Sequence, residues 1–304
     1  MNFLRKITSK IKTVAGAYFL NFFAIFDYLK SKNHIYKEPS ISVFYQCFNQ
    51  PKCVITAIKL FREFYPKNAI FLYSNKGLDM SHIASHFDCK YEYLSNGIDS
   101  GFWFKTKEDI ISWVKRLLFA AQNSKEDFVM IMEDDARVYR KIKKLKFDFN
   151  CVKPCLQLGK DITRFLKIRN SSIPSYINNI YFGGCGGTLI NRKFIVDNFS
   201  NLENLDSAVE ELLPYTKKHF KGALPADGLI TMLIFYFGGT VGMYSGFAEV
   251  GNPGIRGLKD NFLEMSHWKY YLRPFLGRIE VVHNDKSLYN VPLTEEENRI
   301  FLGK

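Results

Sequence analysis

The stretch Phe128-Val-Met-Ile-Met-Glu-Asp-Asp-Ala136 decides the fold that this sequence predicts. Its apolar run, Val129 to Met132, lacks polar alternation, which is typical of a parallel-sheet strand covered on both faces. The run ends in three consecutive carboxylates, Glu133, Asp134 and Asp135. Open α/β sheets bind their ligands at the carboxyl ends of the strands. The stretch therefore predicts a buried strand that carries acidic side chains to a binding edge.

The spacing of the three carboxylates favours a metal site. In an extended chain Glu133 and Asp135 point to one side and Asp134 to the other, so two carboxylates can converge. Converged anions repel each other unless a cation lies between them, and carboxylate oxygens suit Mg²⁺ or Mn²⁺. The alternative is a solvated acidic turn. Charges that continue a strand requiring burial favour the metal site.

The chain before this stretch alternates between strand and helix patterns. Strands are predicted over 41–48, 69–73 and 90–94, and helices over 51–64, 79–87 and 105–122. Alternation at this spacing predicts right-handed crossovers between parallel strands. We therefore expect an α/β fold with a mostly parallel sheet flanked by helices.

The second half is less regular. A glycine-rich strand is predicted over 180–190, because it contains Phe182-Gly-Gly-Cys-Gly-Gly187, and glycines in a strand indicate a backbone pressed against a ligand or another segment. Asn191 is a predicted cap for a helix that ends near Phe199. Further helices are predicted over 206–220 and 229–237, the second opened by Pro225-Ala-Asp-Gly228, and strands over 240–244 and 279–282.

Length and composition set the class of protein. A chain of 304 residues with 47% hydrophobic content can bury a large core, in one large domain or two small ones. Its six cysteines show no zinc-finger pairing, and a chain of this size needs no disulfide framework, so we expect reduced thiols. No cleavable signal is evident. These features predict a cytoplasmic protein.

The net charge of +12 is concentrated near the N-terminus. Residues 1–37 contain seven Lys or Arg and one acid, Asp27, which gives 7 − 1 = +6. Residues 1–32 have the pattern of a basic amphipathic helix, and the apolar run 14–26 is short for a bilayer span. This helix either lies on a membrane surface or packs on its own domain. We expect residues 1–37 to form an extension and residues 38–304 to form one domain.

The order of these features resembles a known enzyme family. A parallel sheet, a strand ending in Glu-Asp-Asp, a glycine-rich segment, a helix opening on an aspartate and a late histidine resemble glycosyltransferases of the GT-A fold. The closest resemblance is to bacterial and large-virus enzymes that build surface glycans. It implies transfer of a sugar, such as a hexose, from a UDP- or GDP-linked donor to a glycan, lipid-linked or protein acceptor.

The resemblance also implies ligands for a divalent cation. Asp135 is the first metal ligand, Glu133 assists the metal or the donor, and Asp134 is a further donor contact. His283 is a candidate ligand near the C-terminus, with His267 as the competitor, and imidazole favours Mn²⁺ over Mg²⁺. Lys286 either contacts phosphate or is a solvated lysine.

Further donor contacts are implied at the strand ends. The nucleoside pocket of the family corresponds here to Gln46, Phe48, Asn49, Ser74 and Asn75. Gly186 and Gly187 correspond to the segment that lets the sugars approach the backbone.

An inverting enzyme also needs a general base on the acceptor hydroxyl. Asp227 is the first candidate and Glu249 the second, and helix capping explains Asp227 without chemistry. A retaining enzyme requires no such base.

Three other functions remain open. A nucleotidyltransferase usually carries a glycine-rich basic loop after the first strand, whereas Gln46-Cys-Phe-Asn-Gln-Pro51 has neither Gly nor Arg. The net charge would suit a nucleic-acid binder, but no such motif is visible, so no nucleic-acid partner is expected. An inactive relative could act as a scaffold or glycan-binding module.

Overall fold

The computed structural model describes residues 38–95, 103–104, 106–142, 156–157, 160–171, 173, 181–182, 186–222, 224–239, 247–249 and 280–304. The helix expected over residues 1–32, the strand predicted over 240–244 and the candidate ligand His267 lie outside these ranges.

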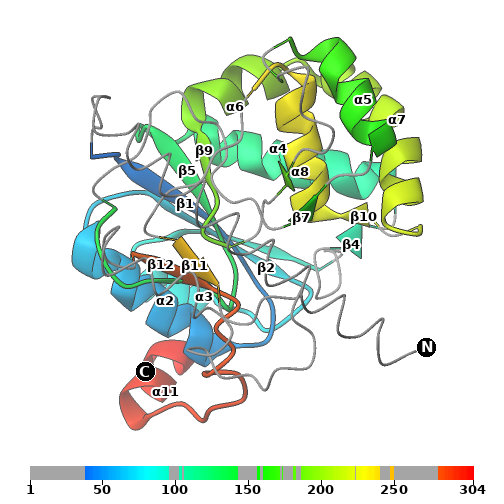
Figure 1. Ribbon diagram of the computed structural model, residues 1–304. Helices are drawn as coiled ribbons and strands as arrows, with labels where there is room; N and C mark the ends of the chain where they lie inside the picture. Colours follow the sequence, from blue (N-terminus) through cyan, green and yellow to red (C-terminus); the bar gives the residue numbers. More distant parts are fainter. Residues whose placement is uncertain are drawn as a thin grey trace, which may run out of the picture.

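A five-stranded sheet in the order β3-β2-β1-β5-β9 forms the centre of the molecule (Figure 1). The strands β1 (Ile41–Cys47), β2 (Ile70–Asn75), β3 (Lys90–Leu94) and β5 (Phe128–Met132) pair in parallel. Only β9 (Leu189–Asn191), beside β5, runs antiparallel within this sheet. The predicted α/β fold with a mostly parallel sheet is therefore confirmed.

Two layers of helices cover the sheet, one on each face (Figure 1). Every residue of β1, β2 and β5 is buried, which explains why these strands are apolar without alternation. One face packs against α2 (Pro51–Phe64) and α3 (Ser81–His86), and the C-terminal helix α11 (Glu295–Leu302) packs on these two helices. The other packs against α4 (Lys107–Gln122), α6 (Arg192–Phe199), α7 (Leu202–His219) and α8 (Ala226–Tyr236), with α5 (Lys160–Arg169) packed on α7 and α8.

Local sequence signals fix several helix starts. Pro51 begins α2, Thr106 and Asp109 form a reciprocal capping box at α4, and the Asn191 side chain accepts from the Phe194 amide at α6. The predicted helix over 79–87 is shorter in the structure, because the Asp79 carboxylate accepts from the Ser81 amide and the Tyr91 hydroxyl before α3 begins. Among the helices described here, none is long and apolar enough to cross a bilayer.

The predicted strand over 180–190 is wrong at Gly186 and Gly187. The structure has two short strands, β8 (Tyr181–Phe182) and β9, and Gly186 and Gly187 lie in a turn that leads into β9. Gly187 has a φ of 87°, a left-handed conformation that glycine adopts without strain. The Gly187 amide still donates to the Ile131 carbonyl at 2.8 Å, so the turn lies against the end of β5.

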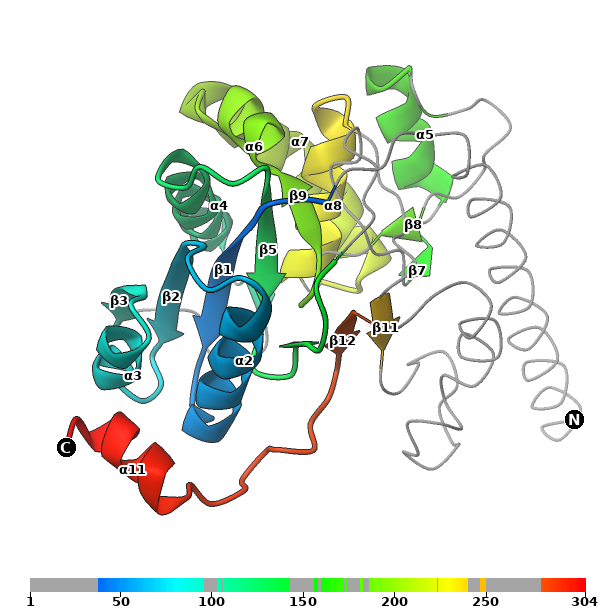
Figure 2. The ribbon, with the colours of Figure 1, turned by 90° about the vertical axis from the view of Figure 1, so that its left-hand side faces the viewer.

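Three small sheets surround the central one. β10 (Leu224–Pro225) pairs with β4 (Trp103–Phe104), and β7 (Leu156–Gln157) pairs with β8. The third sheet has the order β11-β12-β6, formed by β11 (Phe247–Glu249), β12 (Val281–His283) and β6 (Arg137–Val138) (Figure 2). Because β6 follows the acidic triplet directly, this sheet brings the last strand of the chain to the end of β5.

The C-terminal helix is attached to α2 by a salt bridge. The Lys52 ammonium lies 2.6 Å from the Glu297 carboxylate, and the exposed fractions of the two side chains are 16% and 10%. A second pair, Lys59 and Glu296 at 2.8 Å, is more exposed. The pair formed by Lys52 therefore contributes more to the docking of α11.

We predict that Lys52→Met loosens α11, because it leaves the buried Glu297 carboxylate without its cation. The expected loss of local stability is about 1–3 kcal/mol, measured by hydrogen exchange of the amides of residues 295–302. Lys59→Met is the matched control and should cost less than about 1 kcal/mol. Equal exchange rates in the two variants would contradict this account of α11.

Candidate active site

The three carboxylates follow β5 at the edge where ligands bind in open α/β sheets. Glu133, Asp134 and Asp135 are only 9%, 9% and 8% exposed. The strand ends at Met132, and the Ala136 amide donates to the Glu133 carbonyl at 3.0 Å, which closes a tight turn. The directions of the three side chains are therefore set by this turn and not by the alternation of an extended strand. Burial excludes the alternative of a solvated acidic turn.

Glu133 and Asp135 converge on His283. The Nε2 atom of His283 lies 3.4 Å from the Glu133 carboxylate and 3.5 Å from Asp135 Oδ1. One potential ligand atom from each of the three side chains lies within 4.8 Å of the other two. His283 is the last residue of β12, and the Asp285 amide donates to the Asp135 carbonyl at 2.9 Å. Residues about 150 positions apart in the chain thus meet at one point.

The chemistry of this cluster fits a divalent cation. Asp135 Oδ1 is buried and accepts no hydrogen bond in the described part of the chain, so a lone pair is available. Two carboxylates with one imidazole suit Mn²⁺ better than Ca²⁺ or Mg²⁺, which prefer oxygen ligands alone. The cluster is therefore the candidate metal site predicted from Glu133, Asp135 and His283.

Asp134 turns away from this cluster toward β1. Its carboxylate accepts from the Phe48 amide at 3.2 Å and lies 3.5 Å from the Tyr45 hydroxyl. Burial raises the pKa of Asp134 to about 7, and the neighbouring charge of Asp135 adds to this, although the Phe48 amide opposes it. We propose that Asp134 joins the ends of β5 and β1 and does not contact the donor.

Gly186 lies against the cluster. A Cβ atom added to Gly186 would lie 2.7 Å from the Ala136 Cβ, 2.9 Å from the His283 Cδ2 and 3.5 Å from the Glu133 Cβ. Real side chains do not approach this closely, so the position requires glycine. The glycine turn thus packs against the His283 imidazole and the Glu133 side chain, which we assign to the metal site.

The residues predicted for the nucleoside lie at the ends of β1 and β2. Gln46 and Asn75 are buried, and Gln46 Nε2 and Asn75 Oδ1 find no hydrogen-bond partner among the described residues. Ser74 donates its hydroxyl to the Leu78 carbonyl at 2.6 Å, so this hydroxyl holds the loop after β2. Phe48 is half-buried, and Asn49 is exposed. A donor and an acceptor that lack partners inside a protein point to a ligand or to bound water.

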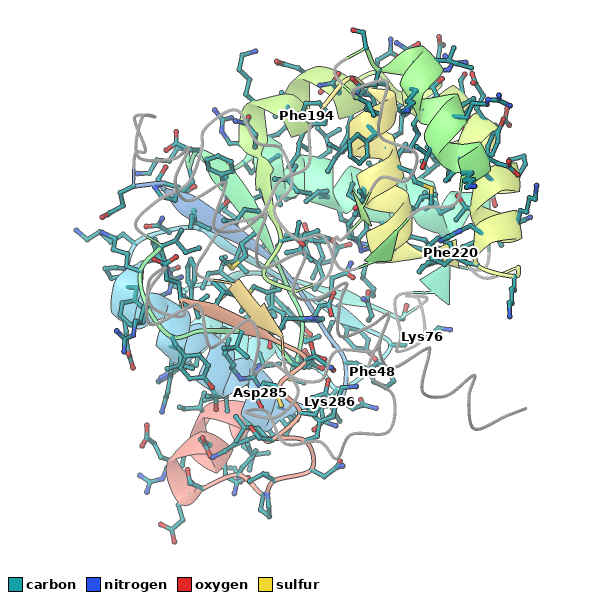
Figure 3. All side chains as sticks on the ribbon, viewed as in Figure 1. Phe48, Lys76, Phe194, Phe220, Asp285 and Lys286 are labelled. Carbon is teal, nitrogen blue, oxygen red and sulfur yellow. The ribbon has the colours of Figure 1, made fainter. Side chains whose placement is uncertain are left out.

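The other candidate residues from the sequence, Asp227, Glu249 and Lys286, lie in three different segments. Asp227 is the second residue of α8, after its cap Pro225, so it is not the N-cap residue. Glu249 ends β11 and pairs in register with His283. Lys286 is exposed, and it lies in the same part of the molecule as Phe48 in Figure 3.

Two residues near the site were not singled out from the sequence. Arg137 is fully buried and donates to the carbonyls of Asp134 and Ala136 at 2.7 and 2.8 Å, so it holds the turn in place. Tyr289 is half-buried, and its pKa is raised, first by burial and then by the charges of Asp135 and Asp134. No local sequence signal marks either residue as part of the site.

Comparison with known proteins finds similar solved structures. No family model and no curated protein matches the sequence. The bifunctional glycosyltransferase WbbM is similar with a TM-score of 0.46 and 12% identity over 88% of this chain and 53% of its own, so this chain spans about half of its length. The galactosyltransferase LgtC, in complex with donor and acceptor sugar analogues, has a TM-score of 0.43 and 14% sequence identity, and the match covers 86% of this chain and 99% of LgtC. The glycosyltransferase GlyE of Streptococcus pneumoniae TIGR4 has a TM-score of 0.42 and 12% sequence identity, and the match covers 86% of this chain and 59% of GlyE.

All three are glycosyltransferases, the class that the sequence resembles. Because these TM-scores and identities are low, the function proposed below depends on this chain's own residues.

We predict that Mn²⁺ binds this cluster and that Asp135→Asn weakens the affinity about 100-fold or more, since it removes a charged ligand. Isothermal titration calorimetry measures both. Asp285→Asn is the matched control, because Asp285 lies two residues from His283 and its carboxylate is engaged by Tyr139 and Ser287. Equal affinities of the two variants would refute the assignment.

Proposed function

We propose that this protein is a metal-dependent glycosyltransferase that transfers a sugar from a nucleotide-diphosphate donor to a glycan, lipid-linked or protein acceptor. The observation that carries the proposal is the buried cluster of Glu133, Asp135 and His283 at the carboxyl end of β5. In an open α/β sheet this edge is where nucleotide ligands bind. The resemblance of the sequence to nucleotide-sugar-dependent enzymes supports the same class.

The cluster suits a diphosphate leaving group. A divalent cation held by the three side chains would supply positive charge where the diphosphate gains negative charge as the sugar departs. The low exposure of Glu133 and Asp135 strengthens this electrostatic effect, because water screens it little. Mn²⁺ is the proposed cation, since His283 contributes an imidazole nitrogen.

The side chains at the ends of β1 and β2 suit the nucleoside. Gln46 can donate and Asn75 can accept a hydrogen bond, and the two unpartnered atoms lie on neighbouring strands. Phe48, at the end of β1, offers an aromatic surface for the base. Both a uracil and a guanine present a donor and an acceptor side by side, so UDP- and GDP-linked sugars are the proposed donors.

The general base for the acceptor hydroxyl is proposed to be Asp227. It lies in the first turn of α8, where the helix dipole favours the ionised carboxylate. Glu249 is the alternative, because its register with His283 places it beside the proposed metal ligand.

A panel of nucleotide sugars tests the proposed function. With Mn²⁺ present, we expect hydrolysis of at least one UDP- or GDP-linked sugar, and Asp135→Ala should lower the rate by about two to four orders of magnitude. Asp285→Asn should retain the activity. A protein that binds Mn²⁺ but neither hydrolyses nor transfers any sugar of the panel would be an inactive relative, and the enzyme assignment would be wrong.

Asp227→Asn distinguishes the two candidate bases. We expect a decrease in kcat of about 10²–10⁴-fold in the transfer reaction with little change in Mn²⁺ affinity, because a base acts on the acceptor hydroxyl. Glu249→Gln should then have a small effect. The reverse order of effects would assign the role to Glu249, and two active variants would exclude a general base at either position.

A further inference from the structure

Helices α5 and α7 pack against each other on the helical side of the molecule (Figure 1). The helices run antiparallel, since Asp161 near the start of α5 pairs with Lys218 near the end of α7, and Arg169 pairs with Glu211. We name the following exposed cations the α5–α7 basic face: Lys160, Arg164, Lys217, Lys218 and Lys221.

The charge of this face is not neutralised by the residues around it. Against its five cations the described parts of the two helix ends place one carboxylate, Asp161, which gives 5 − 1 = +4. His219 adds no positive charge near neutral pH, because partial burial lowers its pKa. In the described ranges Lys160 and Lys217 form no ion pair, and Arg164 interacts with Asp161, the same carboxylate that pairs with Lys218. A field of this sign attracts an anionic surface.

An apolar side chain projects beside these cations. Ile168 is 82% exposed, the largest exposed fraction of any bulky apolar side chain in the described ranges. It follows Arg164 by four residues and Asp161 by seven, so the three lie on one side of α5. The opposite side of this helix is buried through Ile162 and Leu166. Helix α5 therefore fixes an aliphatic group at the edge of the basic face, one turn beyond Arg164.

We propose that the α5–α7 basic face docks the protein on an anionic lipid surface, with Ile168 entering the interface. Cations near such a surface gain electrostatic attraction, and an aliphatic side chain gains by leaving water. An anionic polysaccharide would satisfy the cations but would offer Ile168 no apolar phase. The lipid surface is therefore the partner that both features fit.

The docked orientation would bring the first turn of α8, which contains Asp227, toward the lipid. Phe220, just after α7, lies 2.8 Å from where a Cβ atom of Gly228 would be, so the basic end of α7 packs on the first turns of α8. Asp227 belongs to the same turn. A lipid-linked acceptor would thus approach the helix that carries the base. This orientation rests on the proposed function, whereas the docking itself does not.

Co-sedimentation with vesicles tests the docking. We compare the full chain on neutral phosphatidylcholine vesicles and on vesicles with about 30% phosphatidylglycerol, which supply the negative surface potential. The variant Lys160→Glu/Arg164→Glu/Lys217→Glu/Lys221→Glu should bind the anionic vesicles at least about tenfold more weakly than the wild type. The matched control is Lys67→Glu/Lys125→Glu/Arg140→Glu/Lys304→Glu, which changes the net charge equally at exposed positions elsewhere.

A second variant, Ile168→Ser, keeps the charge and tests the apolar contact. It should weaken binding to anionic vesicles several-fold and leave binding to heparin unchanged. Any binding by residues 1–32 is common to all variants, and Mn²⁺-dependent hydrolysis of the donor should persist in each, which separates this test from that of the enzyme.

Three results would overturn the docking proposal. They are equal affinities of the two charge-reversed variants, no preference of the wild type for anionic vesicles, and strong binding to heparin without binding to vesicles. If Ile168→Ser binds the vesicles as tightly as the wild type, the Ile168 side chain does not enter the lipid. The argument for a lipid surface over a soluble polyanion would then fail.

Discussion

Two carboxylates and an imidazole converge at a buried point at the end of β5, and the electrostatic repulsion between the carboxylates governs the site. Two like charges about 4 Å apart repel by roughly 4 kcal/mol at the effective dielectric constant of a protein. The carboxylates of Glu133 and Asp135 repel each other there unless positive charge lies between them, and the imidazole of His283 brings a nitrogen atom to the same point. The proposed divalent cation would offset this repulsion.

The surrounding architecture forces this arrangement on the side chains. Strand β5 is buried on both faces, so its direction is fixed, and the turn after Met132 is held by Arg137, which donates to two carbonyls. The small sheet β11-β12-β6 then delivers His283, and Gly186 leaves room for its ring. Helix α11 and the segment before it attach the end of the chain to α2. The proposed metal ligands are therefore positioned by elements from both halves of the sequence.

Much of the fold could be predicted because its signals are local. The apolar runs of β1 and β5, Pro51 at the start of α2 and Asn191 before α6 each act within a few residues, and the structure agrees closely at these elements. The glycine-rich segment was predicted as one strand, whereas Gly186 and Gly187 form a turn, and Gly186 packs against the ring of His283, which is distant in the sequence. The convergence of Glu133 and Asp135 was predicted from strand parity, whereas a turn produces it. Tyr289 was missed since only the packing of the C-terminal segment brings it near the carboxylates.

The most direct measurement is a crystal of the protein grown with MnCl₂ and recorded on both sides of the manganese absorption edge. The account predicts an anomalous difference peak within bonding distance, about 2.0–2.3 Å, of the Glu133 and Asp135 carboxylates and of His283 Nε2. A map with no peak among these three side chains, or with the strongest peak elsewhere in the molecule, would contradict it.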